Sequence, residues 1–467
     1  MPRVHAYADD ALGDLDAVGL VAAIRARRVS IPEVVDAAIA RTERVAGDLN
    51  ALAAERFDDA CAEAASPGGG YFAGVPTFVK DNSDLAGLPT QHGTDAFVSP
   101  PAQRDGDFAR MFRATGVLPI GKTQLSEYGF SASAEHPRLG PVRSPWSTDH
   151  TAGASSSGSA ALVAAGAVPL AHANDGGGSI RIPAAVNGLV GLKPTRGRQA
   201  QDRTFRRMPV RVVADGVVTR SVRDTAAFLR EAEKVYRDLS LAPVGDVTRA
   251  ARARRTVAVF TDGIDVRATP EVDSLTRRTA ALLESLGHRV EWIDNPVPPS
   301  FKDDFLLYWG VLASAILATG RMDHGRTWDA SRHDRLTLGL DRHCRRNLHH
   351  VPGAITRLRR SGRLARELHA TYDVVLTPTL ARETPQIGWL DPMQDYETVL
   401  DHLLQWVAYT PWHNASGTPA VSLPLATTAA GLPQGMMLSA DHGQEPMLLE
   451  LAYELEEAQP WPLLRNA

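Results

Sequence analysis

Cysteines and long apolar runs are both scarce in this sequence. Its 467 residues include two cysteines, Cys61 and Cys344, which form no C-x-x-C pair. Neither a disulfide framework nor a thiolate metal site is therefore indicated, and a reducing compartment is favoured. No uninterrupted apolar run reaches the ~20 residues of a membrane-spanning helix. The aspartate-rich residues 1–16 also lack the apolar core of a signal peptide. We therefore expect a cytoplasmic protein with no membrane partner.

Neither sign of charge is in large excess. The net charge is -4, which gives no indication of a nucleic acid partner. Lysine, however, is rare: the 50 basic residues include only five lysines, at positions 80, 122, 193, 234 and 302. In such a chain, a position that needs only positive charge would hold arginine. A buried lysine can instead lose its proton and act as a base.

The hydrophobic pattern predicts an α/β protein that forms one unit, residues 1–467. Ser30 and Glu33 form a capping box in an N-terminal helical segment, residues 1–65, that packs on the rest. Residues 74–197 hold short apolar strands separated by glycine-rich turns, and residues 257–293 read as strand, helix, strand. A further strand is predicted at 374–376 and a helix at 448–455. Strands alternating with helices predict a large mixed β-sheet covered by helices on both faces.

Two segments are rich in glycine and serine: residues 153–159 (GASSSGS) and 175–181 (DGGGSIR). Residues without a Cβ allow several backbone N–H groups to converge on one point, as they do in an oxyanion hole. Ser179 directly follows three glycines and would lie beside such donors. A flexible turn is the ordinary alternative for an isolated GGGS run. This run, however, lies between the apolar segments 168–171 and 180–183.

A serine nucleophile needs a base, and the common serine-hydrolase patterns are missing. The chain has no G-x-S-x-G elbow, and no lysine follows a serine at the S-x-x-K spacing. His172 lies near Ser179 in the sequence, but its apolar surroundings are typical of a core histidine. Lys80 follows an apolar pair, as a lysine at the buried end of a strand would. A surface or salt-bridged lysine fits the same pattern.

The segments around these residues resemble the amidase signature family. The matching segments are Gly153-Ala154-Ser155-Ser156-Ser157-Gly158, Asp175-x-Gly177-x-Ser179-Ile180-Arg181-x-Pro183, Gly74-Val75-Pro76 with Val79-Lys80-Asp81, Gly121-Lys122-Thr123, Leu192 to Gly197, Asp373 to Pro378 and Asn414 to Pro424. The resemblance covers nearly the whole chain. It implies the amidase signature fold and hydrolysis of amide bonds, with anilides, esters and carbamates as further substrates.

The resemblance also implies roles for three side chains. Lys80 would be the base, and Ser155 a bridging serine held through a cis peptide. Ser179 would be the nucleophile that forms a covalent acyl-enzyme. Such chemistry needs neither a metal nor a cofactor. The implied partner is a small-molecule amide or carbamate, with the chain acting as a monomer or homodimer.

The residues around the nucleophile have implied roles as well. Backbone N–H groups of Gly176, Gly177 and Gly178, together with that of Ser179, would form the oxyanion hole. Asp175 and Arg181 would form a pair that orders this loop, either in support of the site or as a purely structural ion pair.

Three other patterns are weaker. Residues 116–123 match the P-loop spacing G-x-x-x-x-G-K-[ST], but the positions between the glycines read as a strand, and Pro119 removes a donor. His349 and His350 are adjacent, which fits no helical spacing of metal ligands. Tyr308, Trp309 and Trp406 are candidates for an aromatic-accepting pocket, with core packing as the ordinary alternative.

The family includes glutamine-transferring subunits of tRNA amidotransferases. Those subunits usually show Thr-Gly-Gly-Ser and a glutamine after the arginine, whereas this chain has three glycines before Ser179 and Ile182 after Arg181. The sequence is closer to stand-alone enzymes such as nylon-oligomer amidases and actinobacterial amidases. Two alternatives remain: a catalytic subunit of a larger complex, and an inactive relative that only binds amides. The intact lysine and serines argue against the second.

Overall fold

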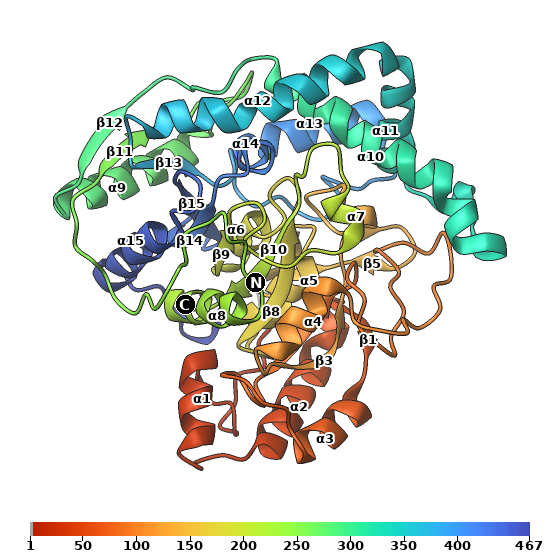
Figure 1. The fold of residues 1–467 in the computed structure, drawn as a ribbon, viewed down its shortest axis with the longest axis vertical. Helices are drawn as coiled ribbons and strands as arrows, with labels where there is room; N and C mark the ends of the chain where they lie inside the picture. The colour runs from red at the N-terminus through yellow and green to blue at the C-terminus, as the bar shows by residue number, and fades with distance from the viewer. Residues whose placement is uncertain (1–2) are drawn as a thin grey trace.

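The computed structural model describes residues 3–467 (Figure 1). The α-helices are α1 (Ala17–Arg25), α2 (Ile31–Leu49), α3 (Phe57–Ala65), α4 (Asp107–Ala114), α5 (Ser157–Ala164), α6 (Arg181–Asn187), α7 (Arg203–Arg206), α8 (Val222–Val235), α9 (Pro270–Ser285), α10 (Phe301–His324), α11 (Arg335–Arg346), α12 (Val351–His369), α13 (Tyr396–Trp406), α14 (Thr410–Ser416) and α15 (Glu445–Ala458). Short 3-10 helices are η1 (Glu127–Gly129), η2 (Gly325–Thr327), η3 (Ala330–Arg332), η4 (Leu348–His350) and η5 (Leu464–Asn466). The strands are β1 (Leu52–Glu55), β2 (Pro76–Lys80), β3 (Leu118–Thr123), β4 (Glu135–His136), β5 (Gly140–Pro141), β6 (Arg143–Ser144), β7 (Ser147–Thr151), β8 (Leu170–Asp175), β9 (Val190–Lys193), β10 (Ala214–Thr219), β11 (Thr256–Val259), β12 (Arg289–Trp292), β13 (Val374–Pro378), β14 (Ala420–Thr427) and β15 (Pro433–Ser439).

A large mixed sheet organises the fold, as the sequence predicted. Its eight strands run in the order β12-β11-β13-β15-β14-β9-β10-β8. Strand β11 is parallel to β12 and to β13, and the other neighbours are antiparallel. A three-stranded sheet, β1-β3-β2, adjoins the β8 edge, where Thr77 Oγ1 donates to the Leu170 carbonyl at 3.0 Å. This junction places the end of β2 beside the end of β8.

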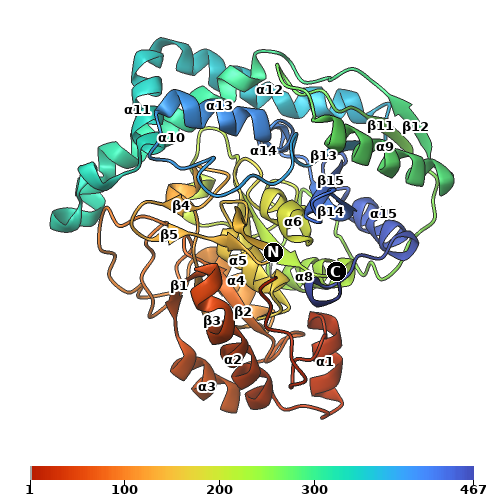
Figure 2. The same ribbon diagram turned by 180° about the vertical axis from the view of Figure 1, so that it is seen from behind.

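Two groups of helices lie at opposite ends of the molecule. In both views α1, α2 and α3 are at the bottom, and α10 to α13 are at the top (Figures 1 and 2). The predicted capping box begins α2: Glu33 N donates to Ser30 Oγ at 3.4 Å, and Ser30 N donates to Glu33 Oε2 at 2.8 Å. The sheet and the site described below lie between the two groups.

The strand–helix–strand unit predicted over residues 257–293 is confirmed as β11, α9 and β12. Thr269 caps α9, Pro270 occupies its first turn, and β11 and β12 run parallel. The P-loop match is confirmed to be a strand, because Leu118 to Thr123 form β3. Within that strand, the buried ammonium of Lys122 pairs with Asp81 at 2.7 Å.

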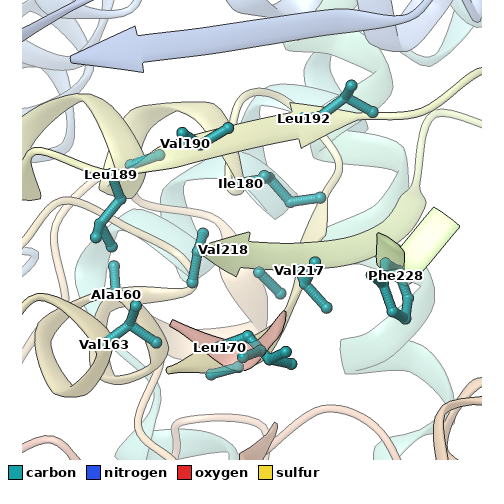
Figure 3. Packing of buried hydrophobic residues seen from close by; sticks show 14 of the residues in the cluster. Ala160, Val163, Leu170, Ile180, Leu189, Val190, Leu192, Val217, Val218 and Phe228 are labelled. Carbon is teal, nitrogen blue, oxygen red and sulfur yellow. The ribbon is translucent and has the colours of Figure 1, made fainter. Parts of the chain in front are cut away.

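The largest cluster of buried apolar residues draws on most of the chain, from Ala6 to Leu455. Part of it lies where α5, β8, β9, β10 and α8 meet; the labelled side chains there include Ala160, Leu170, Val190 and Val218 (Figure 3). Ile180 belongs to the same cluster. Since Ile180 directly follows Ser179, its packing in the core holds the backbone of the candidate nucleophile in position.

Helix α10 is unusually long and apolar. Together with η2 it is long and apolar enough to cross a membrane by length and composition, with a mean hydropathy of 1.4 over its most apolar window. The sequence contains no uninterrupted apolar run of ~20 residues, so that criterion did not predict this helix. A third of that window is buried: α10 packs against α11 and α12, and other residues of α10 line both cavities described below. This role in the site accounts for its composition.

Candidate active site

Lys80 is the last residue of β2 and is completely buried. Its backbone N–H donates to His172 Nδ1 at 3.2 Å, which ties the end of β2 to β8. Its Nζ lies 2.7 Å from Ser155 Oγ and 2.7 Å from Asn174 Oδ1. The structure thus brings together the lysine and the bridging serine named from the sequence, and it adds Asn174.

The surroundings of Lys80 favour its neutral form. Burial lowers the pKa of Lys80 to about 7, although the carboxylates of Asp175 and Asp215 act in the opposite direction. A neutral amine has two N–H groups and one lone pair. The lone pair would accept the Ser155 hydroxyl, while one N–H donates to Asn174 Oδ1. Lys80 is therefore equipped to receive a proton near neutral pH.

Ser155 lies just before α5, and the Ala154–Ser155 peptide bond is cis. Its side chain faces the turn Tyr128-Gly129-Phe130. A Cβ on Gly129 would lie 3.1 Å from Ser155 Oγ, and Gly129 has a φ of +77°. Residue 129 therefore has to be small so that the bridging hydroxyl keeps its place.

Ser179 lies in the turn between β8 and α6 and is 7% exposed. The turn accepts only glycine at 178, where φ is +136° and a Cβ would lie 2.4 Å from Thr410 Oγ1. Thr410 Oγ1 also donates to the Gly177 carbonyl at 2.6 Å. These contacts hold the turn in place, which contradicts the alternative of a flexible turn.

Asp175 organises the turn around Ser179. Its carboxylate accepts hydrogen bonds from Arg181 Nε at 2.8 Å and Nη2 at 2.9 Å, and both side chains are completely buried. Asn414 Nδ2 donates to Asp175 Oδ1 at 2.8 Å, and Arg181 Nη2 donates to Asn414 Oδ1 at 2.7 Å. Burial by itself raises the pKa of Asp175, but the Arg181 guanidinium and its neighbours hold it well below the usual range. The pair therefore orders the loop in the ionised form.

The donors available for an oxyanion differ in one respect from the set implied by the sequence. Gly178 N donates to Asp175 Oδ1 at 2.7 Å, so this N–H is already engaged. Ile180 N likewise donates to Asp175 Oδ2 at 3.2 Å. Within residues 3–467, the N–H groups of Gly176, Gly177 and Ser179 donate no hydrogen bond. The candidate hole therefore consists of these three groups without Gly178.

Two cavities meet at Ser179. One, of about 910 Å³, is lined by Ser155, Asn174 and Ser179 together with many polar residues. The other, of about 110 Å³, is narrow and apolar, and reaches Ser179 between α10 and α13. Gly129, Phe130 and Trp309 line both cavities. Ser155 lines the large cavity and is not among the residues of the narrow one.

The three aromatic candidates for a pocket separate in the structure. Trp309 lies over the glycine turn, where its ring would be 3.4 Å from a Cβ at either Gly176 or Gly177. Tyr308 is instead buried with its hydroxyl on the Val210 backbone, and Trp406 is buried with its indole N–H on the Arg382 carbonyl. Only Trp309 therefore borders the cavities, and the other two pack in the core.

His172 is a core histidine, the reading that the sequence favoured. It is completely buried in β8, stacked on Phe108 at 4.2 Å between ring centroids, with Nε2 3.4 Å from Asp215 Oδ1. Its Nδ1 is occupied by the Lys80 N–H. Across residues 3–467, no group of three or more His, Cys, Asp or Glu side chains is placed to hold a metal ion.

A family model described as Amidase matches residues 33–449 of the chain. The chain belongs to the amidase signature family. The "Putative amidase AmiC" of Mycobacterium leprae is 61% identical over 462 residues, which are 99% of this chain and 98% of that protein. The 6-aminohexanoate-cyclic-dimer hydrolase of Paenarthrobacter ureafaciens is 30% identical, with 96% and 95% of the two chains covered.

Solved structures agree with this placement. A 6-aminohexanoate cyclic dimer hydrolase complexed with substrate superimposes with a TM-score of 0.86 at 29% identity, covering 96% of this chain and 97% of that one. A bacterial aryl acylamidase also gives a TM-score of 0.86, at 25% identity over 97% and 98% of the two chains. The amidase signature fold is thereby confirmed, and the protein is an amidase, a hydrolase of amide C–N bonds.

Several residues of this amidase site were missed in the sequence. Asn174 lies directly before the motif that begins at Asp175 and was given no role, although it holds the Lys80 amine. Asn414 begins a matching segment but had no role, and Thr410 lies four residues before it. The sequence signal that could have identified these three residues is that each lies in or close to a segment matching the family. Gly129 carried no signal of this kind, because only the fold brings it against Ser155.

Proposed function

We propose that this amidase works through Ser179 as nucleophile, Ser155 as proton relay and Lys80 as base. The observation that carries the proposal is the 2.7 Å contact between the buried Lys80 amine and Ser155 Oγ, in surroundings that bring the pKa of Lys80 to about 7. A lysine with its ordinary pKa is protonated at neutral pH and therefore could not accept a proton from Ser155.

The reaction proceeds in two halves. Ser179 Oγ attacks the amide carbon while its proton passes to Ser155 and the Ser155 proton passes to Lys80. The developing oxyanion is stabilised by the N–H groups of Gly176, Gly177 and Ser179. The relay then runs in reverse and protonates the leaving nitrogen, the C–N bond breaks, and an acyl-enzyme remains. Water attacks the ester carbon while the same relay receives its proton. The ester C–O bond then breaks, the carboxylic acid leaves, and the relay returns the proton to Ser179 Oγ.

The relay also fixes the orientation of the substrate. The leaving nitrogen has to collect its proton from Ser155, and Ser155 lines the large cavity. The amine portion therefore occupies the large cavity, and the acyl portion occupies the narrow one. Ile182 lines the narrow cavity where the amidotransferase subunits usually carry glutamine, so its wall is apolar at this point.

The two cavities favour amides with a slender apolar acyl group and a bulky amine portion. Tyr128, Phe130 and Trp309 line the large cavity and offer aromatic faces near the serines. Anilides are therefore preferred substrates, in line with the likeness to an aryl acylamidase. Esters and carbamates also present an acyl carbon to Ser179 and are further substrates.

Ser179→Ala tests the assignment. Loss of the nucleophile removes the acyl-enzyme route, so kcat on an anilide should fall by several orders of magnitude. The variant should also lose covalent labelling by a fluorophosphonate, followed by intact-mass spectrometry. Ser157→Ala is a matched control in the neighbouring serine-rich segment, and it should still be labelled. Labelling that persists in Ser179→Ala would refute the nucleophile.

A further inference from the structure

The narrow cavity contains one charged side chain. Among the described residues that line it, Lys302 alone carries a charge, and nearly all of the others are apolar. Lysine is also the rarer cation in this chain, with five copies among 50 basic residues. An apolar cavity needs no ammonium for its packing. Lys302 therefore calls for a functional explanation.

Helix α10 sets the distance between Lys302 and the reaction centre. Trp309 lies over Gly177 at the inner end of the cavity, and Lys302 lies seven positions earlier on the same helix. A rise of about 1.5 Å per residue places the backbones of the two residues about 10 Å apart along the helix axis, and this spacing approximates the length of the cavity. After about 3 Å for a contact with the ammonium, roughly 7 Å remain for the acyl chain. Because successive C–C bonds of about 1.5 Å zigzag, an extended chain advances roughly 1.25 Å per bond and crosses that length in five or six bonds.

The ammonium of Lys302 has spare hydrogen-bonding capacity. Its Nζ donates to Asp265 Oδ2 at 2.5 Å, and this is its one hydrogen bond within residues 3–467. An ammonium has three N–H donors, so two remain for a ligand. The Lys302 side chain is 29% exposed and that of Asp265 is 74% exposed. Such an exposed pair is weak and yields readily to a second carboxylate.

The sign of the charge determines which acyl groups are suited. Lys302 lines the cavity, whereas Asp265 only follows the lining residue Ile264. A chain that arrives from Ser179 therefore meets the ammonium and not the carboxylate. A terminal carboxylate would be bound there, and a terminal ammonium would be repelled.

We propose that the narrow cavity selects unbranched acyl groups of six or seven carbons that end in a carboxylate, with Lys302 binding that carboxylate. The substrates are monoamides of dicarboxylic acids, and hydrolysis gives the free diacid and the amine. The proposal rests on the function proposed above, specifically on the acyl group lying in the narrow cavity.

Three anilides with six-carbon acyl groups test the proposal: hexanoyl anilide, the monoanilide of adipic acid and 6-aminohexanoyl anilide. An ion pair of this exposure contributes at most about 1 kcal/mol. The kcat/KM of the carboxylate-ended anilide should therefore exceed that of hexanoyl anilide by roughly fivefold, and that of the amino-ended anilide by more. The preference for the carboxylate-ended anilide over hexanoyl anilide should shrink in 1 M salt, where the Debye length falls to about 3 Å.

Variants separate the role of Lys302 from a general effect of charge. Lys302→Met should bring the ratio of carboxylate-ended to methyl-ended kcat/KM close to one, and Lys302→Glu should reverse it in favour of the amino-ended anilide. Lys234→Met is the matched control, because Lys234 pairs with Glu231 on α8 and lines neither cavity. It should leave every rate unchanged.

The outcomes distinguish the two proposals. If wild-type protein hydrolyses hexanoyl anilide without preferring the carboxylate, or if the preference survives in Lys302→Met, the role of Lys302 is overturned and the proposed function stands. If no anilide is hydrolysed and Ser179 is not labelled, the proposed function itself fails. The monoanilide of the four-carbon diacid, succinic acid, serves as the length control. If its preference over butanoyl anilide equals that of the adipic monoanilide over hexanoyl anilide, the length argument is overturned.

Discussion

At the scale of single residues, the charge state of Lys80 controls the proposed chemistry. Its pKa of about 7 is lowered mainly by burial, so the protonated form dominates below pH 7 and the neutral base above it. Amide hydrolysis should therefore rise with pH through neutrality and level off on the alkaline side, in a kcat profile measured on an anilide. Lys80→Arg should lose that activity by several orders of magnitude, because guanidinium stays protonated. Near-wild-type kcat in Lys80→Arg would show that Lys80 is not the base.

A second buried lysine provides the control for this profile. Burial also lowers the pKa of Lys193 to about 7, yet its Nζ donates to the Pro194 carbonyl at 2.9 Å and does not contact either serine. Lys193→Met should therefore keep the alkaline rise. A rise that disappears in this variant would assign the titration to Lys193.

Residue identities were largely readable from the sequence, because the chemistry restricts which side chains are usable. Lys80 and Ser155 were named there, and the structure places them in contact. The engagement of Gly178 by Asp175 was not predictable. It depends on how the turn folds back over the carboxylate, which no spacing along the chain encodes.

At the scale of elements, the β8–α6 turn is the most demanding segment. Gly178→Ala would put a Cβ at a φ of +136° and 2.4 Å from Thr410 Oγ1, so the turn has to shift. Displacement of the oxyanion donors should lower kcat about a hundredfold or more. Circular dichroism should still report a folded protein. A kcat within a factor of two of wild type would mean that the turn tolerates the shift.

The capping box of α2 offers the opposite case, an element whose loss affects stability alone. Ser30 accepts the Glu33 N–H and lies on the surface, far along the chain from Ser155 and Ser179. Ser30→Ala should lower the free energy of unfolding by about 1 kcal/mol, measured by urea denaturation. Its kcat at 25 °C should match that of wild type, and a substantial fall in kcat would contradict this separation.

Local patterns identified elements better than they identified their arrangement. The cap of α2, the unit β11-α9-β12 and the strand β13 each follow from short-range signals. The strand order did not follow, because β13 pairs with β15 and β9 pairs with β14 across long stretches of chain. Those pairings depend on which apolar faces fit together once the helices are in place.

At the scale of the whole molecule, one chain supplies every group that the proposed reaction uses. The base comes from β2, the relay from the segment just before α5, the nucleophile from the β8–α6 turn, and much of the cavity wall from α10 and α13. Such a protein should be active without a second kind of subunit. Activity of the chain alone would distinguish it from an amidotransferase subunit, whose activity depends on a complex.

The purified chain should therefore hydrolyse anilides alone, with a specific activity that stays constant over roughly a thousandfold dilution. A site completed by another subunit loses occupancy on dilution by mass action. Gel filtration at the assay concentrations would show whether the active species elutes as a monomer or a homodimer. A homodimer whose specific activity survives dissociation supports a self-contained site. Activity that appears only after addition of a second protein would contradict it, and would favour a catalytic subunit of a larger complex.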